Sequence, residues 1–145
     1  MPKSDVEQDF PLLIGKEYEL SPESFNFNCL GYALGDECHW WEPPRCPGQY
    51  WPPGFPDDTT ISTVESIIRL HGFTVEIAGV ALPITDAIAI YGQGNDWTHF
   101  AKFSGGNWTS KLGEGHDVTG VELGDLEGLL YGNVVKILRR PDTGL

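Results

Sequence analysis

Two residues of this sequence have the types and the surroundings that nucleophilic catalysis needs. Cys29 follows Asn28, a residue type that caps helices, and the segment from there to Gly35 has the spacing of a short helix with a glycine end. The amide groups of a first helical turn and a nearby imidazole both lower the pKa of a thiol. Cys29 has the first feature by position and needs a histidine that the fold brings close.

His99 is the best placed of the four histidines to be that partner. It begins a predicted strand after the turn-like segment GQGNDWT, and the end of a strand can present a polar side chain to a helix terminus. His39 falls in a proline-rich loop, His71 at the end of a predicted helix and His116 in a glycine-rich loop. Cys29 and His99 therefore form the candidate pair.

A third polar group is expected to orient the imidazole. A two-residue hairpin turn at 105–106 gives a register that places Ser110 on the same face as His99. A slip of one residue would reverse that choice. Asp117, just beyond the hairpin, is the acidic alternative and would stabilise an imidazolium better than a hydroxyl group. The residues alone leave Ser110 and Asp117 both open.

The elements that must position these residues follow from the periodicity of the chain. Besides the helix after Asn28, the segment TTISTVESIIRLHGF predicts a helix with a capping box at Ser62 and Glu65. From residue 73 onward the pattern changes to strands in FTVEIA, DAIAIYG, HFAKFS, NWTSKL and NVVKILRR, with a short helix in VELGDLEGLLYG. The order predicts an α+β fold, with N-terminal helices packed on an antiparallel sheet of about four to five strands.

Residues 36–58 form a tryptophan- and proline-rich loop. They hold six of the 11 prolines and three of the five tryptophans, and proline removes backbone donors, so regular structure is not expected. Paired aromatic side chains beside a nucleophile suit a substrate platform, which makes Trp40 and Trp41 candidate binding residues. Packing of this loop onto the core is the structural alternative.

The three cysteines also suggest a metal site or a disulfide. A metal site would use Cys29, Cys38, His39 and Cys46, but no C-x₂₋₄-C pair is present, so we predict no metal and no cofactor. A Cys38–Cys46 disulfide is open geometrically, and a reducing compartment argues against it.

Composition bounds the class of protein and its partners. The 145 residues, 40% hydrophobic and 21% charged, predict a single domain over 10–145 after a flexible N-terminus at 1–9. The formal net charge of −12 repels phosphate, so nucleic acid and anionic membranes are poor partners. The N-terminus lacks the apolar core of a secretory signal, so we expect a cytoplasmic protein, with specialised export left open.

The order of helix cysteine, strand histidine and next-strand polar residue resembles the papain-like cysteine peptidases and amidases, more narrowly the NlpC/P60 and CHAP branch. The segment HFAKFSGGNWTSK is similar to the strand, glycine turn and strand that carry the histidine there. The pieces FNCLGYALGDECHWWEPP, YWPPG, THFAKFSGGNWTSKLG and YGNVVKILRRP also resemble a small uncharacterised bacterial domain family, with a NC-x-A-x-GD…WWP…H-A…G-x-WTSKLG pattern.

The broader resemblance implies a papain-like fold and a cysteine hydrolase. Cys29 would be the nucleophile, His99 the general base and Ser110 the orienting residue, where such enzymes more often carry His, Asn, Gln or Asp. The amide of Cys29, with Asn28 or Asn26, would donate to the oxyanion. The substrate would be a peptide or a small amide. The alternative is a catalytically inactive module that holds a protein partner through the Trp/Pro-rich loop and its acidic surface.

Overall fold

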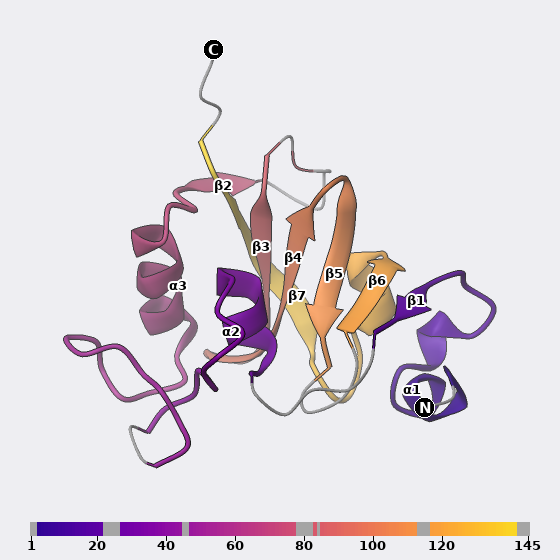
Figure 1. Ribbon diagram of the computed structural model, residues 1–145, viewed down its shortest axis with the longest axis horizontal. Helices are drawn as coiled ribbons and strands as arrows, with labels where there is room; N and C mark the ends of the chain where they lie inside the picture. The colour runs from indigo at the N-terminus through magenta and orange to yellow at the C-terminus, as the bar shows by residue number, and fades with distance from the viewer. Residues whose placement is uncertain are drawn as a thin grey trace.

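The centre of the molecule is an antiparallel β-sheet (Figure 1). The computed structural model describes residues 3–21, 27–44, 47–77, 83, 85–112 and 117–141. Within these ranges the sheet has seven strands in the order β1-β6-β5-β4-β3-β7-β2, and every neighbouring pair is antiparallel. The strands are β1 (Glu19–Leu20), β2 (Val75–Ile77), β3 (Ala87–Gln93), β4 (Asp96–Ser104), β5 (Asn107–Lys111), β6 (Asp117–Val121) and β7 (Asn133–Arg139).

The predicted papain-like α+β fold, with N-terminal helices on a sheet of four to five strands, is wrong. The described helices are few, and one of them is longer than seven residues. They are α1 (Lys3–Asp9), α2 (Cys29–Leu34) and α3 (Ile61–Leu70), with short 3₁₀ turns η1 (Pro11–Leu13) and η2 (Leu123–Leu126). The sheet is larger than expected because the short strands β1 and β6, too brief to show alternation, extend it on one side.

The sheet divides the core into two layers. Along β3, Ala89 and Tyr91 belong to one buried cluster, whereas Ile88 and Ile90 belong to the other, as the two-residue period of a strand requires. Residues of α2 and α3 complete the cluster of Ile88 and Ile90, which we call the α2 face. Residues of α1, η1 and η2 complete the other, the η2 face. Helix α2 contacts β4 and β5, and in Figure 1 it lies beside α3.

The N-terminal segment Lys3–Asp9 forms α1, and Val6 is buried in the cluster on the η2 face. Over the seven residues of α1, the apolar positions are too few for a helical period to be recognised in the sequence.

The hairpin between β4 and β5 is confirmed. Gly105 and Gly106 both have positive φ angles, which glycine adopts without strain, and Ser104 pairs with Asn107 as the two-residue turn predicts. Backbone pairing of the two strands then continues only as far as Lys102 and Thr109. Toward the start of β4 the described ladder is open on the β5 side.

Helix α3 is confirmed, but its cap is not the predicted one. The side chain of Thr60 accepts a hydrogen bond from the amide of Thr63, whereas Ser62 is exposed inside the first turn. Glu65, the predicted partner of Ser62, is instead bound by Lys136 and Arg69. The sequence was misleading here because Ser62 and Glu65 match the capping-box pattern, whereas the residue that caps the helix is Thr60, two positions earlier.

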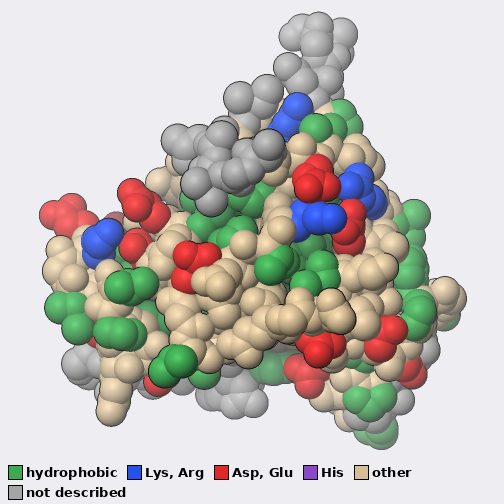
Figure 2. Space-filling model, turned by 180° about the vertical axis from the view of Figure 1, so that it is seen from behind, with side chains coloured by type: hydrophobic (Ala, Val, Ile, Leu, Met, Phe, Trp, Pro, Cys, Tyr) green, Lys and Arg blue, Asp and Glu red, His purple; other side chains and the backbone are tan. Residues whose placement is uncertain are grey.

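The charged side chains are unevenly distributed. From behind, the acidic side chains are spread over the surface, whereas most of the Lys and Arg side chains in view gather in its upper part, beside acidic neighbours (Figure 2).

No described helix is both long enough and apolar enough to cross a membrane.

The cap assignment is testable with a matched pair of variants. Thr60→Ala removes the cap acceptor of α3 and should lower the free energy of unfolding by about 1 kcal/mol. Ser62→Ala, two residues away and exposed, should change it by less than about 0.5 kcal/mol. Urea unfolding followed by circular dichroism measures both, and a larger loss for Ser62→Ala would contradict the assignment.

Candidate active site

Cys29 is the first residue of α2 and is buried on the α2 face. Burial raises the pKa of its thiol to about 12, against the opposing effect of the amide N–H groups of Phe100, Leu30 and Cys29 itself. We expected the start of the helix to lower this pKa. The amides are present, but the loss of water around the sulfur outweighs them, so the thiol is neutral at physiological pH.

Asn28 fixes the start of α2 against the Trp/Pro-rich loop. Its side-chain oxygen accepts from the amides of Gly31 (3.1 Å) and Trp41 (3.0 Å), and its side-chain nitrogen donates to the carbonyl of Trp41 (2.7 Å). The helix cap is thus confirmed. Its side chain, proposed as an oxyanion donor, is committed to holding the loop in place.

A glycine allows the same loop to lie directly on α2. A Cβ atom added at Gly31 would lie 2.8 Å from the carbonyl oxygen of His39 and 2.9 Å from that of Asp36. No other residue type fits at Gly31 without moving this backbone. The loop therefore covers the helix that carries Cys29 at close backbone contact.

His99 is buried on the η2 face. It pairs with Tyr91 across β3 and β4, and its ring stacks on that of Tyr131 with centroids 3.7 Å apart and planes 5° from parallel. Burial lowers the pKa of His99 to about 3. The imidazole is therefore neutral at physiological pH.

Ser110 is the residue that binds this imidazole. The predicted register is correct, and the Ser110 hydroxyl lies in a short hydrogen bond with Nε2 of His99. The same hydroxyl donates to the carbonyl oxygen of Phe100 (2.8 Å). A serine has one hydrogen to donate, so Nε2 must carry the proton of the neutral ring and donate to Oγ. The lone pair of the ring is then on Nδ1.

The backbone of Phe100 lies between the two candidate residues. Its side chain belongs to the same buried cluster as Cys29 on the α2 face, and its amide has the largest of the effects that lower the pKa of the Cys29 thiol. Its carbonyl oxygen accepts a hydrogen bond from the Ser110 hydroxyl, at a position where the backbone pairing of β4 with β5 has ended. Cys29 and His99 thus approach β4 from opposite faces at adjacent positions. Among the described residues no hydrogen bond joins Cys29 to His99 directly.

Asp117 lies elsewhere. It pairs with Lys111 across β5 and β6, and burial raises its pKa against the opposing effects of Ser21 and Lys111. One of its carboxylate oxygens is buried without a hydrogen-bond partner among the described residues. Of the two candidates for the third residue, the structure brings Ser110, not Asp117, to His99.

The tryptophans of the loop mostly pack inward. Trp41 is buried, donates to Asp36 (2.9 Å) and meets Tyr50 edge-on. Trp51 is buried and stacked on Trp97. Trp40 is half-buried. Trp41 therefore supports the loop beside Cys29, and Trp40 has the more accessible ring of the predicted pair.

One important neighbour was missed in the sequence. Tyr131 stacks on His99, and its pKa is raised by burial first and then by the nearby Cys29. It stands in the turn LLYGN, where no spacing links it to a histidine 32 positions earlier. Three residues considered above, Asn26, Cys46 and His116, lie outside the described residues, and Cys38 is an exposed free cysteine.

Residues 18–139 match the family described as Domain of unknown function (DUF7689). The chain belongs to the DUF7689 family. The matched range contains α2, the whole sheet and every residue of the candidate site. No curated protein and no solved structure matches this DUF7689 chain.

The buried neutral histidine should make folding depend on pH. His99 has a pKa of about 3 in the folded protein against 6.5 in the unfolded chain, so the unfolded chain binds more protons as pH falls. Above pH 6.5 the histidine is neutral in both the folded and the unfolded chain. Below pH 6.5 the unfolded chain takes up a proton that buried His99 does not, so the free energy of unfolding falls by about 1.4 kcal/mol per pH unit until about pH 3.

Unfolding by urea between these pH values, in the natural chain and in His99→Gln, measures this effect. The variant keeps a donor for Ser110 but does not titrate, so its stability should fall less steeply with acid. Equal slopes for the natural chain and His99→Gln would contradict the buried neutral state.

Proposed function

We propose that this protein is a cysteine hydrolase that cleaves an amide or isopeptide bond by acyl transfer. The observation that carries the proposal is the position of the Cys29 sulfur beside the amide of Phe100, the residue that follows His99 in β4. The histidine is held as the Nε2–H tautomer by Ser110, and its free lone pair is the base that a neutral thiol requires.

The first step starts from two neutral groups. As the sulfur of Cys29 bonds to the carbonyl carbon of the substrate, its proton passes to Nδ1 of His99, and the carbonyl electron pair moves to oxygen. The backbone pairing of β4 with β5 has ended where these two residues lie, and the Ser110 hydroxyl bridges the strands there. Because the two side chains approach β4 from opposite faces, this step requires that substrate binding bring Nδ1 of His99 and the Cys29 sulfur into contact.

The second half of the reaction returns that proton. The C–N bond breaks, the departing amine takes the proton from the imidazolium, and a thioester with Cys29 is left. Water then attacks the thioester, again losing a proton to His99, and the acid product leaves as the thiol re-forms. The amides of Cys29, Leu30 and Phe100 that surround the sulfur are the donors nearest to the developing oxyanion.

Ser110 has a positioning role in this scheme. It accepts from Nε2–H and stabilises the imidazolium through that bond, but it cannot share the charge as a carboxylate does. The stacked ring of Tyr131 holds the imidazole plane. The proposal therefore predicts an enzyme with a general base rather than a preformed thiolate.

Acylation by a small activated ester tests the proposal without knowledge of the substrate. The background is Cys38→Ser with Cys46→Ser, so that Cys29 is the remaining thiol. With p-nitrophenyl acetate we expect a burst of one nitrophenolate per chain and an acetyl group on Cys29 by mass spectrometry. His99→Gln should slow this step by about 100-fold or more, because it removes the base.

The controls separate catalysis from ordinary thiol reactivity. Cys29→Ser should abolish the burst, and Ser110→Ala should slow it less than His99→Gln while shifting its pH profile. Circular dichroism must show that each variant is folded. If Cys29 in the native chain is acylated no faster than in urea, or equally fast in folded His99→Gln, the hydrolase is refuted and the non-catalytic binding module is favoured.

A further inference from the structure

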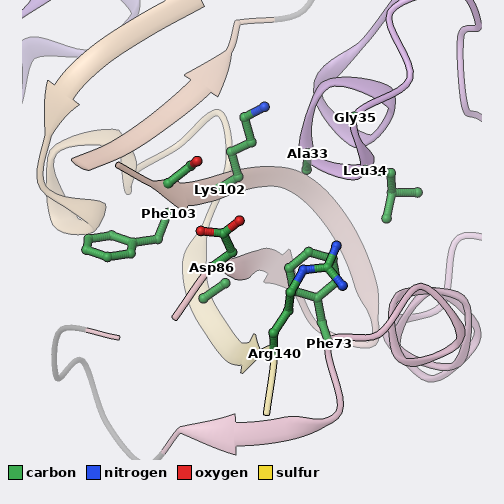
Figure 3. A pocket seen from close by; sticks show the side chains of 10 residues that line it. Ala33, Leu34, Gly35, Phe73, Asp86, Lys102, Phe103 and Arg140 are labelled. Atoms are coloured by element: carbon green, nitrogen blue, oxygen red, sulfur yellow. The ribbon is translucent and has the colours of Figure 1, made fainter. Parts of the chain in front are cut away.

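A hollow separate from the Cys29 site opens at the other end of α2. It lies between the last residues of that helix and the ends of β3, β4 and β7, and its empty space is about 430 Å³ including the open mouth (Figure 3). Its apolar side chains are Ala33, Leu34 and Phe73, whereas the ring of Phe103 points away toward the η2 face.

Three charged side chains line the hollow. Asp86 directly precedes β3, Lys102 is in β4 and Arg140 directly follows β7. The amide of Arg140 donates to the carbonyl of Asp86 (2.9 Å), which fixes the two backbones side by side. In Figure 3 the carboxylate of Asp86 lies between the stem of Lys102 and the guanidinium of Arg140.

These charges do not neutralise one another. Among the described residues, no ion pair joins the Asp86 carboxylate to Lys102 or to Arg140. By contrast, Lys136 contacts Glu65 at 2.7 Å.

Both cations are held by aromatic rings instead. The Lys102 amine lies 4.2 Å from the ring centre of Tyr32, and the Arg140 guanidinium lies 4.2 Å from that of Phe73. One nitrogen of Arg140 also donates to the carbonyl of His71 (3.1 Å), which leaves its other donors for a ligand. In the described structure neither cation forms an ion pair, although the charge of Lys102 acts on the Asp117 carboxylate.

We propose that this hollow binds a free α-amino acid with an apolar side chain. A purely anionic ligand would meet the Asp86 carboxylate, and a purely cationic one would meet Lys102 and Arg140. A zwitterion satisfies both signs, with its carboxylate bound by the two cations and its ammonium group by Asp86. Its side chain then lies on the apolar wall. This site does not depend on the hydrolase activity proposed above.

Titrations of ¹⁵N-labelled protein followed by NMR test the proposal. The probes are L-leucine, L-leucinamide, which lacks the carboxylate, and 4-methylpentanoate, which lacks the ammonium group. L-leucine should saturate shifts in residues of the hollow, and each of the other two should bind at least about tenfold more weakly.

Charge-removing variants assign the two ends of the ligand. Lys102→Gln and Arg140→Gln should each weaken L-leucine about tenfold without affecting L-leucinamide. Asp86→Asn should weaken L-leucine without weakening 4-methylpentanoate. Arg139→Gln removes an adjacent guanidinium that does not line the hollow, and it should bind L-leucine as the natural chain does.

Several results would overturn the proposal. They are no saturable shift with millimolar L-leucine, equal binding of all three probes, equal weakening by Arg139→Gln, or inorganic phosphate displacing L-leucine at lower concentration. The last would indicate a general anion site. The NMR spectrum of each variant shows directly whether it is folded, so a loss of binding in an unfolded chain is not counted.

Discussion

The hydroxyl group of Ser110 has a single hydrogen, and the Phe100 carbonyl takes it. That donation closes the part of the β4–β5 ladder where backbone pairing has stopped. It also decides which nitrogen of His99 carries a proton, because the oxygen can then only accept from Nε2. The same bond therefore joins two strands and sets the direction in which the histidine can act. A threonine or an alanine at this position would change the sheet and the imidazole together.

Burial shapes the chemistry as much as hydrogen bonding does. It raises the pKa of the Cys29 thiol and lowers that of the His99 imidazole, so each group is uncharged at physiological pH. A resting thiolate beside an imidazolium, the state that the start of a helix would favour in water, is disfavoured inside this core. The amides of Phe100, Leu30 and Cys29 lie around the sulfur and favour its charged form, but burial outweighs them.

Local features were predictable from the sequence, whereas the larger architecture was not. The cap at Asn28, the left-handed glycine at Gly35 and the hairpin at 105–106 each depend on residues within a few positions, and all are confirmed. The contact of Ser110 with His99 followed from that hairpin. The seven-stranded sheet did not follow, because β1 and β6 pair over short stretches distant in sequence, and their residues show no alternation.

The position of β7 also has a consequence for how the chain folds. In the described sheet β7 lies between β3 and β2, and β2 is hydrogen-bonded to β7 alone. During synthesis β2 emerges about sixty residues before its partner, whereas β3, β4 and β5 can pair as successive hairpins as soon as they appear. Until β7 is made, β3 is an unprotected sheet edge rich in isoleucine and alanine. The ribosome-bound chain is then most exposed to aggregation just before its last strand is inserted.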